Sequence, residues 1–339
     1  SMMREYGLML AIENDNSHRP EVALTHCPFF HTACLSILVK MLALCGTFVL
    51  VDKVDPAFIL SQIEKYRVTM MLMVPPLLYM RLYDSGLWKQ HDLSSLREAQ
   101  FTGGKCSMDY VHKIFTMFPN CKLRPSYGST EVCASCSAVL SREEFERRPE
   151  LCKTVGRINA NCEMKLVDND GNEVPVGEVG EGLVRSPSLF RGYIKNEELN
   201  ARVLRDGWFH TEDLLRRDEE GFYYLVDRKK DMIKTGGENV YAQEVEDVLR
   251  NHPAVFDCAL IGVEDDRFGE AVAAAIVLNE GCELSDEELI AYCRQNLPSY
   301  KKPRYVAFVD DLPHNVTGKI QKSVLRENSD RLFRPVRGL

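Results

Sequence analysis

A glycine-containing turn with two hydroxyls and a carboxylate, Tyr127–Glu131, is the first candidate site in the sequence. It follows a short strand-like run that ends at Pro125. The backbone and the hydroxyls of Ser129 and Thr130 could hold a phosphate, and the carboxylate of Glu131 could hold Mg²⁺, a hard cation that prefers oxygen ligands. The alternative interpretation is a surface turn that opens a helix, with Ser129 or Thr130 as the N-cap.

A lysine near the C-terminus is the second candidate. Lys319 ends the turn-rich segment Pro313–Lys319, directly before an expected final helix at Lys319–Arg326. An ammonium group at that place could reach into a cleft and neutralise charge that develops on a transferred acyl-phosphate. A solvated surface lysine is the alternative interpretation.

Two adjacent glycines, Gly236 and Gly237, lie in the polar segment Lys234–Asn239 immediately before an expected helix. Glycine permits the close approach of a ligand or a positive φ. The segment is therefore a candidate ligand contact, and a plain turn is the alternative.

A fourth polar segment, His210–Asp213, follows Gly207–Phe209. The carboxylate of Asp213 could accept hydrogen bonds from sugar hydroxyls, as acidic residues do with ribose in other nucleotide sites. Otherwise it is an ordinary carboxylate in a loop at a strand end.

Strands and helices alternate through residues 20–150, which predicts an α/β subdomain with a mostly parallel sheet covered on both faces. Ligands of such sheets bind beyond the carboxyl ends of the strands, and the turns at 102–104 and 127–131 fall at such ends. The expected strands are Val22–Leu24, Phe48–Val51, Thr69–Val74, Leu96–Phe101 and Lys122–Pro125, and the expected helices are Thr32–Leu44, Pro56–Tyr66 and Met108–Phe118.

Turn signals become frequent in residues 151–227, which predicts a small β-rich subdomain. We expect residues 1–227 to form part of a large N-terminal domain, and residues 228–339 to form a compact α+β domain after a charged joint. Its expected helices are Ala242–Asn251 and Asp286–Asn296, the latter with Ser285 as N-cap and Glu288 completing a capping box, and its expected strands are Phe256–Val263, Ala271–Leu278 and Arg304–Val309.

The charge pattern argues against two classes of partner. A net charge of −8 without a clustered basic surface is unlike a nucleic-acid binder. The apolar stretch Ala33–Val51 is nearly long enough to span a membrane, but Lys40 lies in its middle and Gly46 interrupts it. We expect a helix and a buried strand there, and no transmembrane segment.

Twelve cysteines are scattered along the chain, many of them in apolar runs where a thiol packs as a small hydrophobe. Cys133 and Cys136 form the only close pair, which could be redox-active or half of a zinc site. Buried free thiols are the default interpretation, and they indicate a reducing, cytoplasmic location.

Taken in their order and spacing, these motifs resemble the adenylate-forming superfamily, which includes acyl-CoA synthetases, luciferases and peptide-synthetase adenylation domains. The resemblance covers essentially the whole chain, and Lys234–Asn239 is most similar to CoA ligases that act on fatty or aromatic acids. The segments that carry it are Pro28–His31, Gly103–Gly104, Tyr127–Glu131, Gly207–Asp213, Asp227–Glu246 and Pro313–Lys319.

The resemblance implies a two-step ligation. A carboxylate attacks the α-phosphate of ATP to give an acyl-adenylate and pyrophosphate, and the thiol of coenzyme A then displaces AMP. It implies ATP or AMP, Mg²⁺ and coenzyme A as ligands, with a fatty or aromatic carboxylic acid as substrate.

By the same resemblance, Lys319 bridges the substrate carboxylate and phosphate, Thr130 contacts phosphate, and Glu131 holds Mg²⁺. The implied nucleotide contacts are Gly104, Ser126, Tyr127 and Gly128 around the adenine, and Asp213 and Arg228 on the ribose.

The remaining implied roles concern the acid, the thiol and the movement of the lid. His31 and Gly103 border the acyl pocket, and Gly236 and Gly237 line the tunnel for the pantetheine arm of coenzyme A. Lys230 is the hinge about which the C-terminal lid domain, residues 228–339, swings between the two steps.

Two departures from the family pattern stand out. Glu212 occupies a position at which the family usually has glycine. The Ser/Thr- and Gly-rich ATP loop of the family has no counterpart between Ser1 and His31. We therefore expect the chain to be the C-terminal portion of such an enzyme, not competent for the whole reaction alone, with an exposed sheet edge that favours homo-oligomers.

Other functions remain open. The acyl acceptor could be the thiol of a carrier protein, or the adenylate itself could be the product. A non-catalytic module that binds nucleotide or coenzyme A is the alternative from another class.

Overall fold

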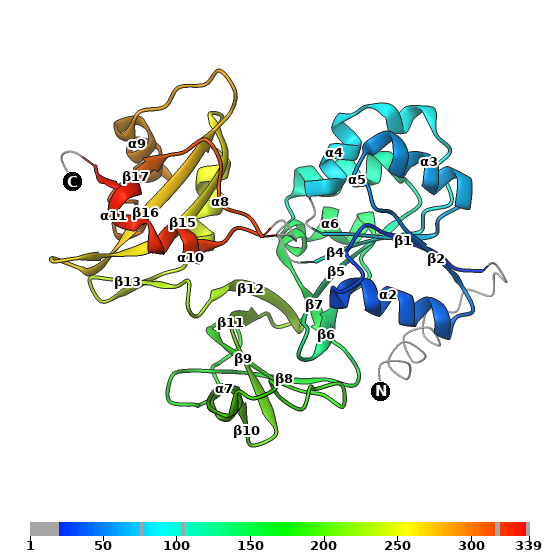
Figure 1. Ribbon diagram of the computed structural model, residues 1–339, viewed down its shortest axis with the longest axis horizontal. Helices are drawn as coiled ribbons and strands as arrows, with labels where there is room; N and C mark the ends of the chain where they lie inside the picture. Colours follow the sequence, from blue (N-terminus) through cyan, green and yellow to red (C-terminus); the bar gives the residue numbers. More distant parts are fainter. Residues whose placement is uncertain (1–19, 75–76, 103–105, 316–318, 337–339) are drawn as a thin grey trace. The chain divides into compact units, whose positions relative to one another are not determined.

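The computed structural model describes residues 20–74, 77–102, 106–315 and 319–336 (Figure 1). The chain divides into two compact units. Unit 1 comprises Ser1–Thr211 with Leu215–Leu225, and unit 2 comprises Glu212–Leu214 with Val226–Leu339.

Unit 1 is built on a 12-stranded sheet whose first five strands run parallel in the order β2-β1-β3-β4-β5. This confirms the predicted α/β class with a mostly parallel part. The five strands are β1 (Val22–Thr25), β2 (Thr47–Leu50), β3 (Met70–Met73), β4 (Glu98–Phe101) and β5 (Lys122–Ser129), and the helices between them are α2 (Thr32–Ala43), α3 (Pro56–Tyr66), α4 (Leu77–Asp84), η1 (Leu87–Gln90) and α5 (Met108–Met117).

Helices cover both faces of these strands, as the sequence predicted. Successive strand residues point to opposite faces, so Leu24 and Met71 pack with α3, α4 and α5, while Ala23 and Met70 pack with α2. Figure 1 shows α2 on one side of the strands and α3, α4 and α5 on the other. Lys40 on α2 is buried in this packing, and among the described residues no helix has the length and apolar character needed to cross a membrane.

The sheet continues through antiparallel strands in the order β6-β7-β12-β11-β9-β8, with β10 beside β11. These strands make residues 151–227 rich in β-structure. Their bounds are β6 (Cys133–Ser137), β7 (Gly156–Ile158), β8 (Glu163–Val167), β9 (Val179–Arg185), β10 (Leu204–Arg205), β11 (Trp208–Arg217) and β12 (Phe222–Arg228), with α6 (Arg142–Arg147), η2 (Pro149–Lys153) and α7 (Glu197–Val203) between them.

Unit 2 has a six-stranded sheet in the order β14-β13-β16-β17-β18, with β15 beside β16. Helices α8 and α9 pack on one face, and α10 and α11 pack on the other. The bounds are β13 (Ile233–Thr235), β14 (Glu238–Val240), α8 (Ala242–Arg250), β15 (Val255–Asp265), β16 (Gly269–Leu278), α9 (Asp286–Asn296), η3 (Ser299–Lys301), β17 (Tyr305–Phe308), α10 (Lys322–Glu327), α11 (Ser329–Leu332) and β18 (Arg334–Pro335).

Three local expectations need correction. Ser129 does not open a helix, because β5 runs through it and a tight turn leads directly into β6. Gly236 and Gly237 do not lie immediately before α8, because they join β13 to β14 in a hairpin. The final helix starts at Lys322 rather than Lys319, and α11 and β18 follow it.

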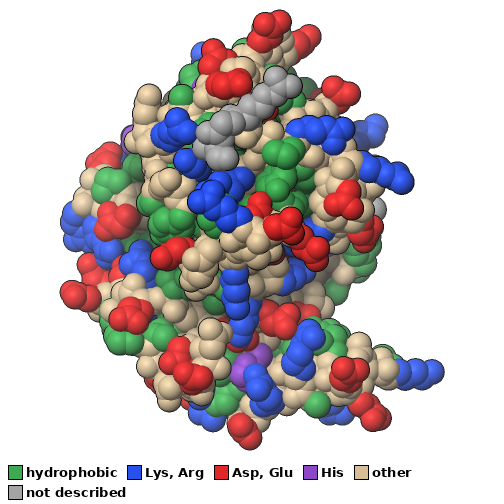
Figure 2. Space-filling view, turned by 90° about the vertical axis from the view of Figure 1, so that its left-hand side faces the viewer, with side chains coloured by type: hydrophobic (Ala, Val, Ile, Leu, Met, Phe, Trp, Pro, Cys, Tyr) green, Lys and Arg blue, Asp and Glu red, His purple; other side chains and the backbone are tan. Residues whose placement is uncertain are grey.

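All twelve cysteines lie in the described ranges, none forms a disulfide, and ten of them are buried. Burial raises the pKa of the Cys136 thiol. The described residues contain no group of three or more His, Cys, Asp or Glu side chains that could hold a metal ion, so the pair Cys133 and Cys136 does not belong to such a group. On the face displayed in Figure 2, basic and acidic side chains are interspersed.

Candidate active site

The first part of the site lies at the carboxyl end of the parallel strands. The Thr102 hydroxyl donates a hydrogen bond to the carbonyl of Ser126 at 2.9 Å, and the Ser126 hydroxyl donates to the carbonyl of Phe101 at 3.3 Å. These bonds join the end of β4 to β5 just where β5 passes the edge of the parallel strands. Ser126 and the buried Tyr127 therefore lie at the edge at which sheets of this type bind ligands.

Gly128 is required by the close approach of β6. A Cβ atom at this position would lie 1.8 Å from the carbonyl oxygen of Cys133. The pairing of β5 with β6 also has an irregularity between Tyr127 and Gly128, and Cys133 has a left-handed φ of 63°. The glycine therefore lets the hairpin close tightly and present Ser129, Thr130 and Glu131 at its tip.

Glu131 is held from a distant part of the chain. Its Oε1 accepts a hydrogen bond from the hydroxyl of Tyr193 at 2.7 Å, and its backbone carbonyl accepts one from the amide of Phe190 at 2.7 Å. Mg²⁺ sites shared with phosphates usually use only one or two protein carboxylates. A single oriented glutamate at the hairpin tip therefore fits a Mg²⁺ ion that is also held by a nucleotide.

The N-terminus of α2 reaches the same hairpin. The side chain of Thr32 donates to the hydroxyl of Thr130 at 3.1 Å, and Nδ1 of His31 caps the helix by accepting from the amide of Ala33 at 3.1 Å. The first amides of a helix favour negative charge. Thr130 thus lies where a phosphate can meet both a hydroxyl pair and a helix N-terminus.

Asp213, Arg228 and Lys319 come together within unit 2. Arg228 Nε lies 3.6 Å from Asp213 Oδ1, whose side chain is mostly buried while that of Arg228 is half exposed. The pKa of the Lys319 ammonium is lowered because neighbouring protein atoms reduce its hydration and because Arg228 repels it, while Asp213 acts in the opposite direction. Lys319 nevertheless keeps an exposed surface, so a ligand can reach it.

The backbone around Lys230 is tied to Glu212. The amide of Lys229 donates to the carbonyl of Glu212 at 2.8 Å. Glu212 has a φ of 57°, in the left-handed region that favours glycine. This explains in physical terms why a glycine suits this position.

Gly236 and Gly237 have φ values of 57° and 87°, the pattern of a two-residue hairpin turn with both central residues left-handed. The amide of Gly236 donates to the carbonyl of Phe268 at 3.0 Å, and a Cβ at Gly236 would lie 3.1 Å from the Phe268 ring. The turn is therefore both narrow and packed against an aromatic side chain.

The structure thus brings the predicted residues together in two sets. Ser126–Glu131 and His31 surround one edge in unit 1, and Asp213 pairs with Arg228 in unit 2, close enough to Lys319 for both charges to affect its pKa. Gly103 and Gly104 lie outside the described residues. Thr32 and Tyr193 were missed; Thr32 follows His31 directly, whereas no local pattern marks Tyr193.

A sequence model of the AMP-binding enzyme family matches residues 2–194, and one of the AMP-binding enzyme C-terminal domain matches residues 244–319. Feruloyl-CoA synthase from Amycolatopsis sp is 37% identical over 307 residues, which cover 90% of this chain and 61% of that protein. The chain thus spans about three fifths of the length of this curated relative.

Solved structures of adenylate-forming enzymes have the same fold. ATP-bound MatB from Rhodopseudomonas palustris matches with a TM-score of 0.85 and 28% identity, over 97% of this chain and 64% of that chain. The amide bond synthetase McbA from Marinactinospora thermotolerans matches with a TM-score of 0.81 and 32% identity, over 95% of this chain and 64% of that chain.

Proposed function

Because this chain belongs to the AMP-binding enzyme family and its relatives include acyl-CoA ligases, we propose that the protein joins a fatty or aromatic carboxylic acid to coenzyme A through an acyl-adenylate. The observation that carries the proposal is the set of contacts at the β5–β6 hairpin. There Thr130 meets Thr32, and Glu131 is oriented by Tyr193.

In the adenylation step, Thr130 and the N-terminus of α2 bind the phosphate that the carboxylate attacks. Mg²⁺, when bound at Glu131 together with the nucleotide, neutralises phosphate charge. Tyr193 fixes the rotamer of Glu131 before the nucleotide arrives, so little reorganisation is needed at the moment of reaction. Ser126, Tyr127 and Gly128, with Gly104, flank the adenine.

Asp213 and Arg228 bind the ribose hydroxyls, and Lys319 stabilises the charge that builds between the substrate carboxylate and the α-phosphate. The paired geometry of Asp213 and Arg228 suits a diol, because one residue accepts hydrogen bonds and the other donates them. Holding an ammonium group at the reacting atoms also fixes their orientation, which lowers the barrier.

The remaining proposed roles concern the hinge, the pantetheine arm of coenzyme A and the acyl group. Lys230 serves as the hinge of a C-terminal lid domain that begins at residue 228. The narrow hairpin turn at Gly236 and Gly237 leaves room for the pantetheine arm because neither residue carries a side chain. His31 and Gly103 border the acyl group.

Binding of non-hydrolysable acyl-adenylate analogues tests this function on the chain itself. Acyl sulfamoyl-adenosines with feruloyl, benzoyl, hexanoyl and palmitoyl groups are titrated by calorimetry, and such ligands carry no β- or γ-phosphate. We expect one class to bind at least tenfold more tightly than AMP, and Asp213→Ala to weaken it about tenfold. Equal binding of all analogues, or none, would contradict the proposal.

The acceptor is tested separately. On a protein in which this chain is joined to the ATP-loop region expected from the family, carboxylate-dependent pyrophosphate release is followed with ATP and Mg²⁺. The fate of the acyl group is then compared with coenzyme A, a carrier-protein thiol and a simple amine. The amine belongs in this comparison because an amide bond synthetase is among the structural neighbours. We expect the thioester of coenzyme A; amide formation alone would overturn the choice of acceptor.

A further inference from the structure

Strand β15 lies at an edge of the sheet of unit 2. Among the described residues it pairs only with β16, in a register that is continuous from Asp257 to Asp265. In an antiparallel pair, every second residue turns its backbone N–H and C=O away from the partner strand. One side of β15 therefore carries a row of outward backbone groups. Such a row is a template on which a further strand can pair, including a strand of a second copy of the chain.

Side chains of α8 bind part of this outward row. Oε1 of Glu246 accepts the backbone amide of Leu260 at 2.9 Å, and Arg250 donates to the carbonyl of Cys258 at 2.9 Å. The amide of Cys258 donates to Oδ1 of Asp257 at 2.8 Å, and Arg250 donates to the same oxygen at 2.9 Å. The outward groups of Cys258 and the amide of Leu260 are thus bound by side chains where a neighbouring strand would otherwise bind them.

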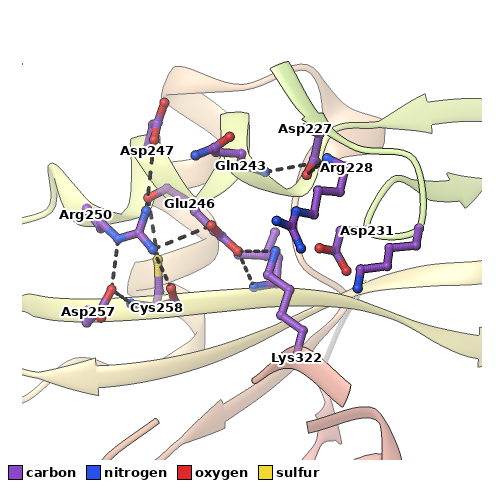
Figure 3. Close-up of polar contacts among 12 residues, drawn as sticks. Asp227, Arg228, Asp231, Gln243, Glu246, Asp247, Arg250, Asp257, Cys258 and Lys322 are labelled. Atoms are coloured by element: carbon purple, nitrogen blue, oxygen red, sulfur yellow. Dashed lines mark hydrogen bonds and ion pairs between the residues drawn. The ribbon is translucent and has the colours of Figure 1, made fainter. Parts of the chain in front are cut away.

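Lys322 reaches the same place from the other face of the sheet. It belongs to α10, whereas Glu246 belongs to α8, and the two helices pack on opposite faces. Nevertheless, Lys322 Nζ lies 2.7 Å from Glu246 Oε1, the oxygen that binds the amide of Leu260. The two side chains can meet beside Leu260 only around the outer edge of β15, because paired strands separate the two faces elsewhere. Figure 3 shows Lys322 extending from α10 toward Glu246, and Arg250 approaching from α8.

The charged contact over the edge is held firmly. The side chains of Lys322 and Glu246 are only 15% and 7% exposed, and Arg250 Nη2 lies 3.5 Å from Glu246 Oε2. Breaking a buried ion pair by removing one partner is strongly destabilising, because the other charge is left without compensation. An incoming strand would have to separate Glu246 from both cations to reach the amide of Leu260. The contact therefore excludes such a strand.

The edge beyond Leu260 is open. The same alternation places Gly262 and Glu264 in the outward row, and within the described part of the chain no side chain binds their outward backbone groups. Gly262 is half-buried and Glu264 is exposed. This open segment is short compared with the strands of ordinary sheets. Stable pairing on β15 would therefore also need the outward groups of Cys258 and Leu260.

We infer that Glu246, Arg250 and Lys322 form an edge cover, which takes the place of a neighbouring strand on β15 and keeps a second copy of the chain from pairing there. The excluded partner is the same strand of another copy, because two identical outward rows can pair antiparallel about a two-fold axis. The inference concerns association through unit 2 and does not depend on the proposed function.

Hydrogen exchange of the full chain at low and high protein concentration tests the edge cover. Glu246→Ala with Lys322→Ala opens it, whereas Glu246→Gln with Lys322→Met keeps an acceptor for the amide of Leu260 and a long side chain over the edge. In the opened variant we expect exchange at Gly262 and Glu264 to slow at least tenfold at high concentration, with a matching rise in mass by sedimentation. The variant that keeps the cover should behave like the unsubstituted chain.

A second ion pair of α8 provides the matched control. Lys301 Nζ, in η3, lies 2.6 Å from both carboxylate oxygens of Glu244. Glu244→Ala with Lys301→Ala should leave exchange at Gly262 and Glu264 independent of concentration. The same slowing in this control, or exchange independent of concentration in the folded opened variant, would overturn the inference. Because the readout is specific to β15, association through the edge of unit 1 does not imitate it.

The unsubstituted chain gives a further test that holds even if the opened variant folds poorly. In dilute solution the amide of Leu260, bound by Glu246, should exchange at least tenfold more slowly than the outward amide of Gly262. Equal rates at the two amides would show that Glu246 does not cover the edge, and would equally overturn the inference.

Discussion

The hydroxyl of Tyr193 donates a 2.7 Å hydrogen bond to Glu131 Oε1, across 62 residues of sequence. The phenol ring is in turn packed edge-on against Phe190, whose amide binds the carbonyl of the same glutamate. Side chain and backbone of Glu131 are therefore both held by the segment that follows β9. A carboxylate fixed in this way can meet a metal ion without first losing rotamer freedom.

Replacing Tyr193 by Phe tests this arrangement. The substitution removes one hydrogen bond to a charged acceptor and keeps the ring packing, so Glu131 should bind Mg²⁺ less favourably. Since such a bond is worth about 1.5–3 kcal/mol, we expect the Mg²⁺ concentration needed for half-maximal ATP binding to rise by about 10- to 150-fold. Calorimetric titration of ATP at graded Mg²⁺ measures this. The exposed Tyr66 on α3 provides the control, as Tyr66→Phe should not shift the midpoint.

The ammonium of Lys319 should lose its proton at a lower pH than an ordinary lysine, because limited hydration and the charge of Arg228 lower its pKa. Acetic anhydride reacts with the neutral amine, so the pH at which Lys319 becomes modified reports on this pKa by mass spectrometry. Arg228→Met should raise the pKa and delay modification, whereas Asp213→Asn should lower it further.

The lowered pKa of Lys319 should also shift the pH dependence of the proposed activity to lower pH. In its proposed role Lys319 neutralises charge on the reacting phosphate only while it is protonated, so adenylation should decline at a pH below 10.5, the ordinary pKa of lysine. Modification of Lys319 no earlier than the surface lysines would contradict this account.

Variants of Glu212 test how much the left-handed backbone at this position lowers the stability of the chain. Glycine adopts a φ of 57° without strain, whereas alanine shares the constraint of glutamate and removes the same side-chain contacts. We therefore expect Glu212→Gly to be more stable than Glu212→Ala by about 1 kcal/mol in urea unfolding. Equal stability of the two variants would show that the backbone at this position relaxes.

A buried ion pair under α2 should make unit 1 sensitive to acid. Arg124 donates to both carboxylate oxygens of Glu98 at 2.9 Å. Burial raises the pKa of Glu98, but Arg124 and Lys40 outweigh it and lower the pKa from 4.5 to about 2. This contribution to stability is complete above pH 4.5 and is lost as the pH falls towards 2.

Replacing Arg124 by Met leaves Glu98 buried without its main partner and should cost about 3–5 kcal/mol at pH 7. The difference from the unsubstituted chain should shrink towards pH 3, because Glu98 is protonated there in the variant. Urea unfolding at the two pH values measures this. Adding Glu98→Gln to Arg124→Met should recover part of the loss, and a loss independent of pH would refute the assignment.

Elements with local signals were predicted well from the sequence. Helix α3 begins and ends at the expected residues, with Asp55 as its N-cap and Pro56 in the first turn. The capping box of Ser285 and Glu288 is present in α9. In both cases the signal and the structure it specifies lie within a few residues of each other.

Contacts between segments that are distant in the sequence could not be predicted from it in the same way. Nothing around Tyr193 predicts its bond to Glu131, and the left-handed Cys133 that turns β5 into a hairpin has no glycine or asparagine signal. In the sequence Lys40 only interrupts an apolar stretch, and nothing around it predicts that the fold places it near Glu98. These relationships exist only once the sheet has assembled.

The pairing of β5 also bears on how unit 1 unfolds. Its first half forms a parallel ladder with β4 from Glu98 to Phe101, and its second half forms an antiparallel ladder with β6 from Ser126 to Ser129. The parallel part and the antiparallel part of the sheet therefore share one strand, with a separate ladder on each half of it. Loss of the hydrogen bonds on either side would expose an edge of β5, so we expect the two parts to melt together in one cooperative transition.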